Sequence, residues 1–390
     1  MLKQKANILF YLFFIPSVLA LISFFVNTTY PNVVYMLANV IGIVLLFFMT
    51  NIRLKKVMIV YILFYVFCTL FFPQVEGSRM YSSTVLFTNI ALLFFSAHSY
   101  QTPIPKGIIE KMDFYMLFFS IIIIVGQIIT IDNPWLYLTF KHDYIEEDAL
   151  EQKGFLISHS FGYFLAAFSF YFAYRRKVFW VVLYTILCLF FSRRTNICLC
   201  LIAWLYYLHN MVNRKYFIVF LLVILLIFIA YINTLIMFSD FAFSLDPSDR
   251  ESAEFTSGRS TFWGTYFLYV QSGHMNLWDF LIGFGPSSSR FFNESYSGLR
   301  VWMHNDFIDL AYCTGILGLA LYVIAIFKCC SSNNHWLLAF ILIAANLNGF
   351  ILYQAYPVIY IFSLIKGFKK YGFSEKKVVS PTCFCHSSSL

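Results

Sequence analysis

The chain of 390 residues is 60% hydrophobic and only 12% charged, and its mean hydropathy is +0.74. A soluble domain carries about 25% charged residues, so this composition argues against a water-soluble protein and predicts a polytopic membrane protein. The net charge of +8 comes from short basic clusters between apolar runs, a pattern typical of membrane topology signals and not of nucleic-acid binding.

Apolar runs long enough for membrane helices recur along the chain. A helix of about 20 residues crosses the ~30 Å hydrocarbon core, where open strands would leave unpaired amides. We predict an all-α fold, one integral membrane domain over residues 1–390, with about twelve spans; eleven is the alternative, because the seventh and the last two are short. The expected spans are 6–26, 33–49, 57–72, 82–97, 113–131, 155–174, 178–191, 195–211, 216–238, 306–327, 336–348 and 352–366.

Lysine and arginine divide unequally between alternate connections. The set of connections that includes both termini holds 18 of these residues, and the other set holds 9. The acidic residues divide the opposite way. Because basic residues accumulate on the cytoplasmic side, we expect both termini in the cytoplasm, including a tail over 367–390.

Two connections on the outer side are longer than turns. Segment 132–154 is the first long periplasmic loop, and 239–305, between the ninth and tenth spans, is a much larger one. Loops longer than about 15 residues in a compact protein are usually functional. We therefore expect the chemistry of this protein to face outward.

Nucleotide and metal chemistry find no support in the sequence. It contains no G-x-x-x-x-G-K-[ST] phosphate loop, no Asp-x-Asp pair for a metal-bound sugar nucleotide, and no histidine or cysteine spacing typical of a metal site. Gly283 and Gly285 are better explained by a tight turn. We expect neither a metal nor another cofactor.

Arg193 and Arg194 are an anomaly, because they lie in a short connection on the expected outer side, where topology disfavours positive charge. Snorkelling to lipid headgroups, or an error in the span count, would explain them. We favour an anion site, because guanidinium groups bind phosphate oxygens through paired hydrogen bonds.

A further arginine lies in the large loop. Ser257 is a plausible N-cap for a helix over 258–271, which places Arg259 in the first turn and gives the helix an aromatic face. One interpretation is an amphipathic helix on the membrane surface. The other is an anion site, because free amides and the helix dipole favour negative charge at a helix N-terminus.

A histidine stands where the large loop returns to the membrane. Asn305 and Asp306 follow His304 and are expected to cap the next span, and Asp309, one turn later, is placed to orient the imidazole. A lone histidine is more often structural than catalytic. Histidine is nevertheless the side chain best suited to accept a proton near neutral pH.

Together these motifs resemble one known family. Their order is Ser192-Arg193-Arg194-Thr195, Gly258 to Trp263, the turn at Gly283 and Gly285, His304-Asn305, and Gly315-Ile316-Leu317-Gly318. This pattern is similar to the bacterial O-antigen polymerase (Wzy type) and O-antigen ligase superfamily, membrane glycosyltransferases of the C-type fold. The resemblance is specific over about 185–325 and rests on topology elsewhere.

The resemblance implies a metal-independent glycosyltransferase whose donor is an oligosaccharide on undecaprenyl diphosphate. It assigns diphosphate binding to Arg259 and to one of Arg193 and Arg194, and the role of base to His304. Asn305, Asp306 and Asp309 have supporting roles. The candidates for stacking on sugar rings are Trp263, Trp278, Tyr296 and Trp302, although anchoring at the membrane interface is the commoner role of such residues.

We therefore expect an O-antigen polymerase in the bacterial cytoplasmic (inner) membrane, joining lipid-linked repeat units at the periplasmic face. Its expected partners are the bilayer, the lipid-linked oligosaccharide, and a chain-length regulator and flippase of the same pathway, with no nucleic acid. One alternative is an O-antigen ligase, which transfers the finished chain to lipid A core. Another, from a different class, is a repeat-unit flippase or transporter, which predicts charges buried in mid-span and related halves; the sequence offers neither.

Overall fold

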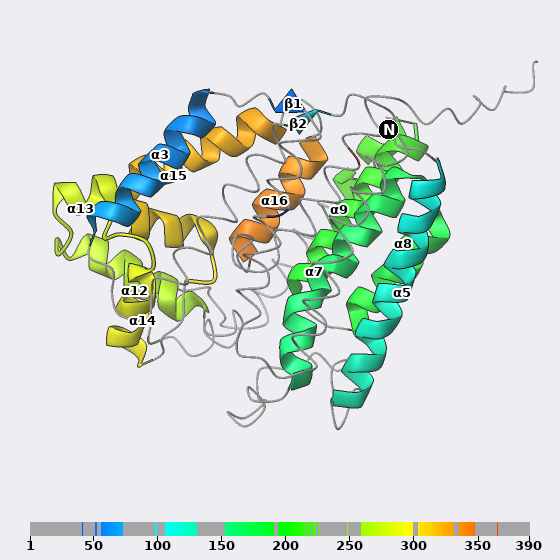
Figure 1. Ribbon diagram of the computed structural model, residues 1–390, viewed down its shortest axis with the longest axis horizontal. Helices are drawn as coiled ribbons and strands as arrows, with labels where there is room; N and C mark the ends of the chain where they lie inside the picture. The colour runs from blue at the N-terminus through cyan, green and yellow to red at the C-terminus, as the bar shows by residue number, and fades with distance from the viewer. Residues whose placement is uncertain are drawn as a thin grey trace, which may run out of the picture.

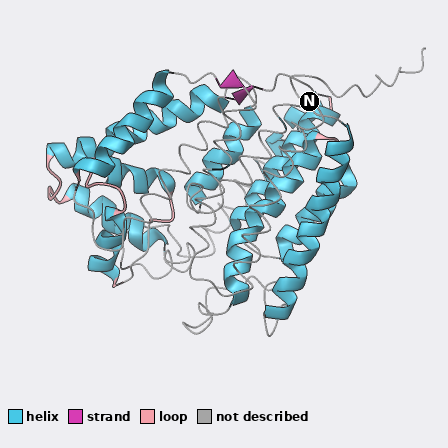
Figure 2. Ribbon diagram, in the orientation of Figure 1, coloured by secondary structure: helices cyan, strands magenta, loops and turns pink. Residues whose placement is uncertain are grey.

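The computed structural model describes residues 41, 51–52, 56–72, 98–99, 106–130, 153–190, 194–213, 215–219, 221–223, 226, 248, 259–298, 303–330, 335–347 and 365. These residues are mostly helical, with one two-residue antiparallel pair, β1 (Asn51–Ile52) with β2 (His98–Ser99) (Figures 1 and 2). The all-α prediction is confirmed for this part of the chain. Several predicted segments lie outside the described residues. They are the expected spans 6–26 and 82–97, the tail, most of the spans 33–49, 216–238 and 352–366, and the first long loop up to residue 152.

Two groups of helices make up the described structure. The main array consists of α3 (Lys56–Phe71), α5 (Lys106–Thr130), α7 (Lys153–Tyr174), α8 (Val178–Phe190), α9 (Arg194–Met211), α15 (Asp306–Cys330) and α16 (His335–Leu347). The large loop contributes α12 (Arg259–Gln271), α13 (Leu277–Ile282) and α14 (Ser288–Ser297). The expected helix boundaries agree within about two or three residues, except that α5 begins earlier, since its first two turns carry charge and were excluded from the apolar run.

Helix α7 forms the centre of the main array. It packs against α5, α8 and α9, and every side chain from Tyr163 to Ala173 is buried. Phe168 meets Tyr184 of α8 edge-on, with ring centroids 5.5 Å apart. A Cβ added at Gly162 would lie 1.8 Å from the Asn196 Nδ2 atom, so the absence of a side chain there lets α9 approach α7 closely. A helix that is apolar on all faces is typical of a buried position inside a large bundle.

Alternating helix directions give the array two ends. Helices α7 and α8 are joined by the short turn at 175–177, so α9 begins, at Arg194, at the opposite end from that turn. The Trp336 ring at the start of α16 lies 5.6 Å from the His209 ring near the end of α9. Helix α16 therefore runs antiparallel to α9 and ends where α9 begins. We call the end with the 175–177 turn the basic end and the opposite end the loop end.

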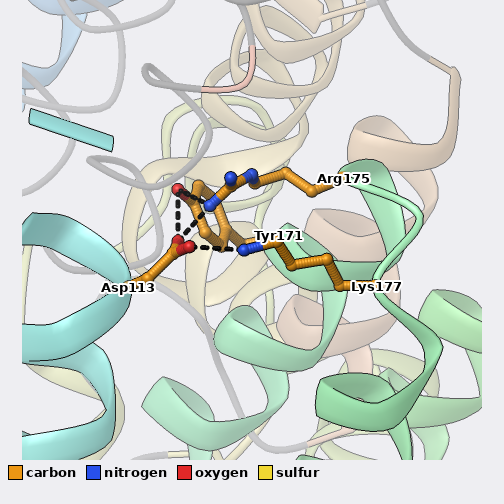
Figure 3. A network of polar contacts seen from close by, with 4 residues as sticks. All are labelled: Asp113, Tyr171, Arg175 and Lys177. Carbon is orange, nitrogen blue, oxygen red and sulfur yellow. Dashed lines mark hydrogen bonds and ion pairs between the residues drawn. The ribbon is translucent and has the colours of Figure 1, made fainter. Parts of the chain in front are cut away.

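A carboxylate joins helices at the basic end (Figure 3). Asp113 of α5 accepts from Arg175 and, at 2.7 Å, from Lys177, and the Tyr171 hydroxyl donates to the same carboxylate at 3.2 Å. The Arg175 and Asp113 side chains are only 11% and 15% exposed, so water screens this pair weakly. The network fastens α5 to the α7–α8 turn.

Helix α15 is broken, in contrast to the unbroken span that the sequence predicts over 306–327. Gly315 has non-helical dihedral angles (φ 65°, ψ −177°) and separates a first segment, 306–314, from a second, 316–330. By length and composition alone, Asp306–Lys328 is the one helix among the described residues that qualifies to cross a membrane. Lys56–Phe71 and Val178–Cys188 are shorter apolar helices.

Candidate functional site

The large loop folds onto the first segment of α15 around its own apolar cluster. The buried members of this cluster are Phe262, Tyr266, Phe292, Met303, Tyr312 and Cys313. Figure 1 shows α12, α13 and α14 gathered beside α3 and α15, away from α5 and α8. Burial raises the pKa of the Tyr266 phenol further above neutral pH, in keeping with its apolar surroundings. The loop is thus a packed element at the loop end of the array.

The structure places the first turn of α12, which begins at Arg259, beside His304. Arg259 is the half-buried first residue of α12. One turn later, the Phe262 ring lies 6.4 Å from the His304 ring, and the Trp263 indole N–H donates to the Met303 carbonyl at 2.8 Å. Residues three and four apart share a helix face, so Arg259 lies on the face of α12 that meets the 303–304 segment.

The backbone holds His304 in an unusual conformation. Its φ of 52° is left-handed, which is uncommon for a residue other than glycine and clusters at functional sites. The next residue, Asn305, caps α15: its side-chain oxygen accepts from the N–H groups of Phe307 at 2.9 Å and Ile308 at 3.2 Å. Its side-chain nitrogen donates to Asn346 of α16 at 2.8 Å. The predicted cap is confirmed for Asn305, and it fastens the histidine segment to the main array.

Two acidic residues lie buried in the first turn of α15, Asp306 and Asp309. The Asp309 carboxylate accepts from the Ser289 hydroxyl of α14 at 2.5 Å, and the Cys313 sulfur lies 4.0 Å from its other oxygen. These contacts join α14 to α15, and the expected orientation of the His304 imidazole by Asp309 stays a prediction. Ser289 was not among the residues predicted from the sequence; its signal there is a run of serines, which is typical of a helix start.

The two glycine motifs of the sequence lie against each other. A Cβ added at Gly283 would lie 2.5 Å from the Cys313 carbonyl carbon, and one added at Gly315 would lie 2.3 Å from the Leu281 main chain. Both glycines have positive φ, 76° and 65°, which L-residues with side chains rarely adopt. Contact of backbone on backbone therefore requires glycine at both positions.

The turn at Gly283 and Gly285 also completes the hydrogen bonding of the broken helix. At the break, the carbonyls of Tyr312 and Cys313 accept from the N–H groups of Phe284 at 3.0 Å and Gly285 at 2.9 Å. Carbonyls freed at the end of a helix need such partners. The predicted tight turn is confirmed, and it ties the large loop to α15.

The remaining predicted residues occupy different positions. Arg194 begins α9, and α16 packs against both α9 and α15, so the starts of α9 and α15 share the loop end. Trp263 belongs to the apolar cluster of the loop, whereas Trp278 and Tyr296 are exposed. Arg193 and Trp302 lie outside the described residues.

The chemistry of the site follows from an arginine at a helix start and a histidine in a strained turn. The first favours an anion, and the second is suited to move a proton. Among the residues that the structure describes, no group of three or more His, Cys, Asp or Glu side chains is placed to hold a metal ion. No protein-family model, curated protein or solved structure matches the chain.

Proposed function

We propose that this protein is an O-antigen polymerase of the Wzy type, a twelve-span glycosyltransferase that joins undecaprenyl-diphosphate-linked oligosaccharide repeat units at the periplasmic face of the bacterial inner membrane. One observation carries the proposal. Arg259, at the start of α12, and His304, in the turn before α15, converge at the same end of the molecule through Phe262.

The proposed transfer requires two functions that these residues supply. The acceptor hydroxyl oxygen forms a bond to the anomeric carbon of the donor sugar while the bond from that carbon to the diphosphate oxygen breaks. His304 takes the hydroxyl proton, and the electron pair leaves with the diphosphate. Arg259, together with Arg193 or Arg194, stabilises the departing charge, and the positive end of the α12 dipole adds to this effect.

The distribution of charge supports a site that faces outward. Arg175 and Lys177 lie at the basic end, and Lys328 lies there too, because the end of α15 leads into the start of α16. Asp306 and Asp309 lie at the loop end with His304. Under the positive-inside rule the basic end is cytoplasmic, and the site at the loop end is periplasmic.

A gel of lipopolysaccharide from the native host tests the proposal. The gene is deleted and complemented with the wild type or with His304→Ala. The deletion should leave cores capped by a single repeat unit, the wild type should restore the ladder, and His304→Ala should not. A complete ladder in the deletion strain would contradict the proposed polymerase.

Other patterns on the same gel identify the rival functions. Bare cores with polymer retained on the lipid carrier would identify a ligase. Bare cores without that polymer would indicate a step before polymerisation, as expected for a repeat-unit flippase. If His304→Ala restored the full ladder, the protein would still be a polymerase, but His304 would not be its base.

A further inference from the structure

Over the residues that the structure describes, the helices of the α3–α15 pair are shorter than the bilayer that the proposed function requires. Helix α3 has 16 residues, and the second segment of α15, 316–330, is of similar length. The two run antiparallel, since the Tyr61 and Tyr322 rings lie 5.5 Å apart and Gly318 lies beside Phe64. At 1.5 Å per residue each helix rises about 24 Å, whereas the hydrocarbon core is ~30 Å thick. The described part of each helix therefore covers somewhat less than the full thickness of the core.

Helix α13 packs at the loop end of the α3–α15 pair. Its last residues, Leu281 and Ile282, press their main chain against Gly315, where α15 breaks. A Cβ added at Gly285 would lie 2.5 Å from the Cβ atom of Phe72, which directly follows α3. Helix α13 and its turn thus stand where the short pair ends.

The free surface of α13 is apolar. Leu277 and Trp278 are 70% and 69% exposed, and Phe280 is exposed as well. The single charged residue of α13, Asp279, is engaged in a reciprocal cap with Asn276: the Asp279 N–H donates to the Asn276 side chain at 2.9 Å, and the Asn276 N–H donates to the Asp279 carboxylate at 3.3 Å. A clustered apolar surface of this kind marks an interaction site.

The α3–α15 pair also exposes apolar side chains near its loop end. Leu70 and Phe71 at the end of α3 are exposed, as are Ile316 and Leu317 directly after the break in α15. In the proposed membrane setting these side chains face lipid. Because the end of α13 is packed against Gly315, this helix lies beside the part of α15 that carries Ile316 and Leu317.

Backbone N–H groups in the turn after α13 form hydrogen bonds within the protein, as an apolar environment requires. The Gly283 N–H donates to the Asp279 carbonyl at 2.8 Å, and the next two N–H groups donate to the carbonyls of Tyr312 and Cys313. Non-helical backbone is tolerated at membrane depth only where its polar groups are satisfied within the protein.

We propose that α13 is a re-entrant element of the large loop, embedded in the outer leaflet with Leu277, Trp278 and Phe280 against lipid acyl chains. The inference rests on the membrane setting of the proposed function. It assigns Trp278 to lipid contact instead of sugar stacking. It also explains how the loop that carries Arg259 is held near the level of lipid-linked diphosphates.

Quenching of tryptophan fluorescence by brominated lipid tests this inference. The full-length protein is reconstituted in vesicles of phosphatidylcholine brominated at acyl positions 6,7 or 11,12, and wild type is compared with Trp278→Phe. The wild type should lose more emission to bromine than the variant, and the difference should be larger for the shallower 6,7 label. Trp204→Phe is the control for the loss of one indole, since the Trp204 N–H donates to Thr185 inside the array at 2.9 Å.

The outcomes separate this inference from the function on which it rests. If other tryptophans are quenched by bromine while the Trp278 component responds only to aqueous iodide, α13 lies in water and the inference fails alone. If bromine quenches no tryptophan, the membrane setting itself fails, and the inference fails with it.

Discussion

Arg259 is the residue on which, in the proposed function, binding of the diphosphate depends most directly. Replacing it with alanine removes the guanidinium at the start of α12, and we expect activity to fall about 10²–10³-fold, as for the loss of one donor to a developing charge. Arg259→Lys keeps the charge without the paired donors and should recover only part of the activity. The O-antigen ladder of the complemented deletion strain, with an immunoblot of the membrane fraction, measures both effects.

Arg176→Ala is the matched control for that experiment. Arg176 is exposed and lies in the turn at the basic end, far along α7 from the loop end. We expect a full ladder from this variant. A full ladder from Arg259→Ala at normal abundance would show that the arginine has no part in the reaction.

Ser289 tests the contact between α14 and α15. Removing its hydroxyl leaves the buried Asp309 carboxylate without the donor that lies 2.5 Å from it, so Ser289→Ala should lower the free energy of unfolding by about 1–3 kcal/mol. Thermal unfolding of the detergent-solubilised protein measures the change. Ser272→Ala, at an exposed serine that donates to the Tyr269 carbonyl, should alter stability by less than about 0.5 kcal/mol. Equal stabilities for the two variants would contradict the proposed importance of the buried contact.

At the level of elements, the turn at Gly283 packs into the break of α15. Substitution of glycine by alanine should therefore lower stability by different amounts at different positions. Gly283→Ala meets both a positive φ and a backbone 2.5 Å away, so it should cost about 1–3 kcal/mol beyond the dihedral penalty. Gly298 has a similar φ of 72° but open space around it, so Gly298→Ala should cost only the dihedral penalty of about 1–2 kcal/mol. Gly107→Ala, in helix α5 with nothing nearby, should be neutral or stabilising. Thermal unfolding in detergent orders the three variants, and we expect Gly283→Ala to be the least stable; a Gly298→Ala variant that is less stable would contradict the packing of Gly283.

The helices were predictable because their signals are local. Apolar runs bounded by charge or turn residues locate α7, α8, α9 and α16, and Arg259 and the aromatic face locate α12. The break at Gly315 was not predictable from the same signals, because Gly315 sits inside an apolar run that continues unbroken. The break coincides with close packing against Gly283, a contact between residues distant in sequence about which local hydrophobicity contains no information.

For the whole molecule, the separation of charge between the two ends predicts the topology. Alkaline phosphatase fused after Lys177, at the basic end, should be inactive, and the same enzyme fused after Gly298, in the large loop, should be active. A cytoplasmic fluorescent reporter at the same two positions should give the opposite pattern. The reverse result would place the Arg259–His304 region in the cytoplasm and remove the proposed donor from its reach.

The sequence indicates which residues are candidates for the site, but not the contacts that these residues make. Arg259 stood out as a basic residue in the first turn of an expected loop helix, and His304 and Asn305 as polar residues at the edge of an apolar run. The cap by Asn305 follows the usual preference for a helix start. The pairing of Ser289 with Asp309, and of Asn305 with Asn346, depends on how the loop and α16 pack on α15. Such contacts between separate elements leave no periodic trace in a single sequence.

Transfer by the purified protein is the most direct test of the proposed glycosyltransferase. The purified protein in proteoliposomes is supplied with repeat units on undecaprenyl diphosphate, in the presence of a metal chelator, and both polymer and released undecaprenyl diphosphate are measured. We predict that the wild type forms a ladder and releases the carrier in proportion, and that His304→Ala does neither while remaining folded. Full turnover by His304→Ala, or no transfer by the wild type, would contradict a glycosyltransferase with His304 as its base.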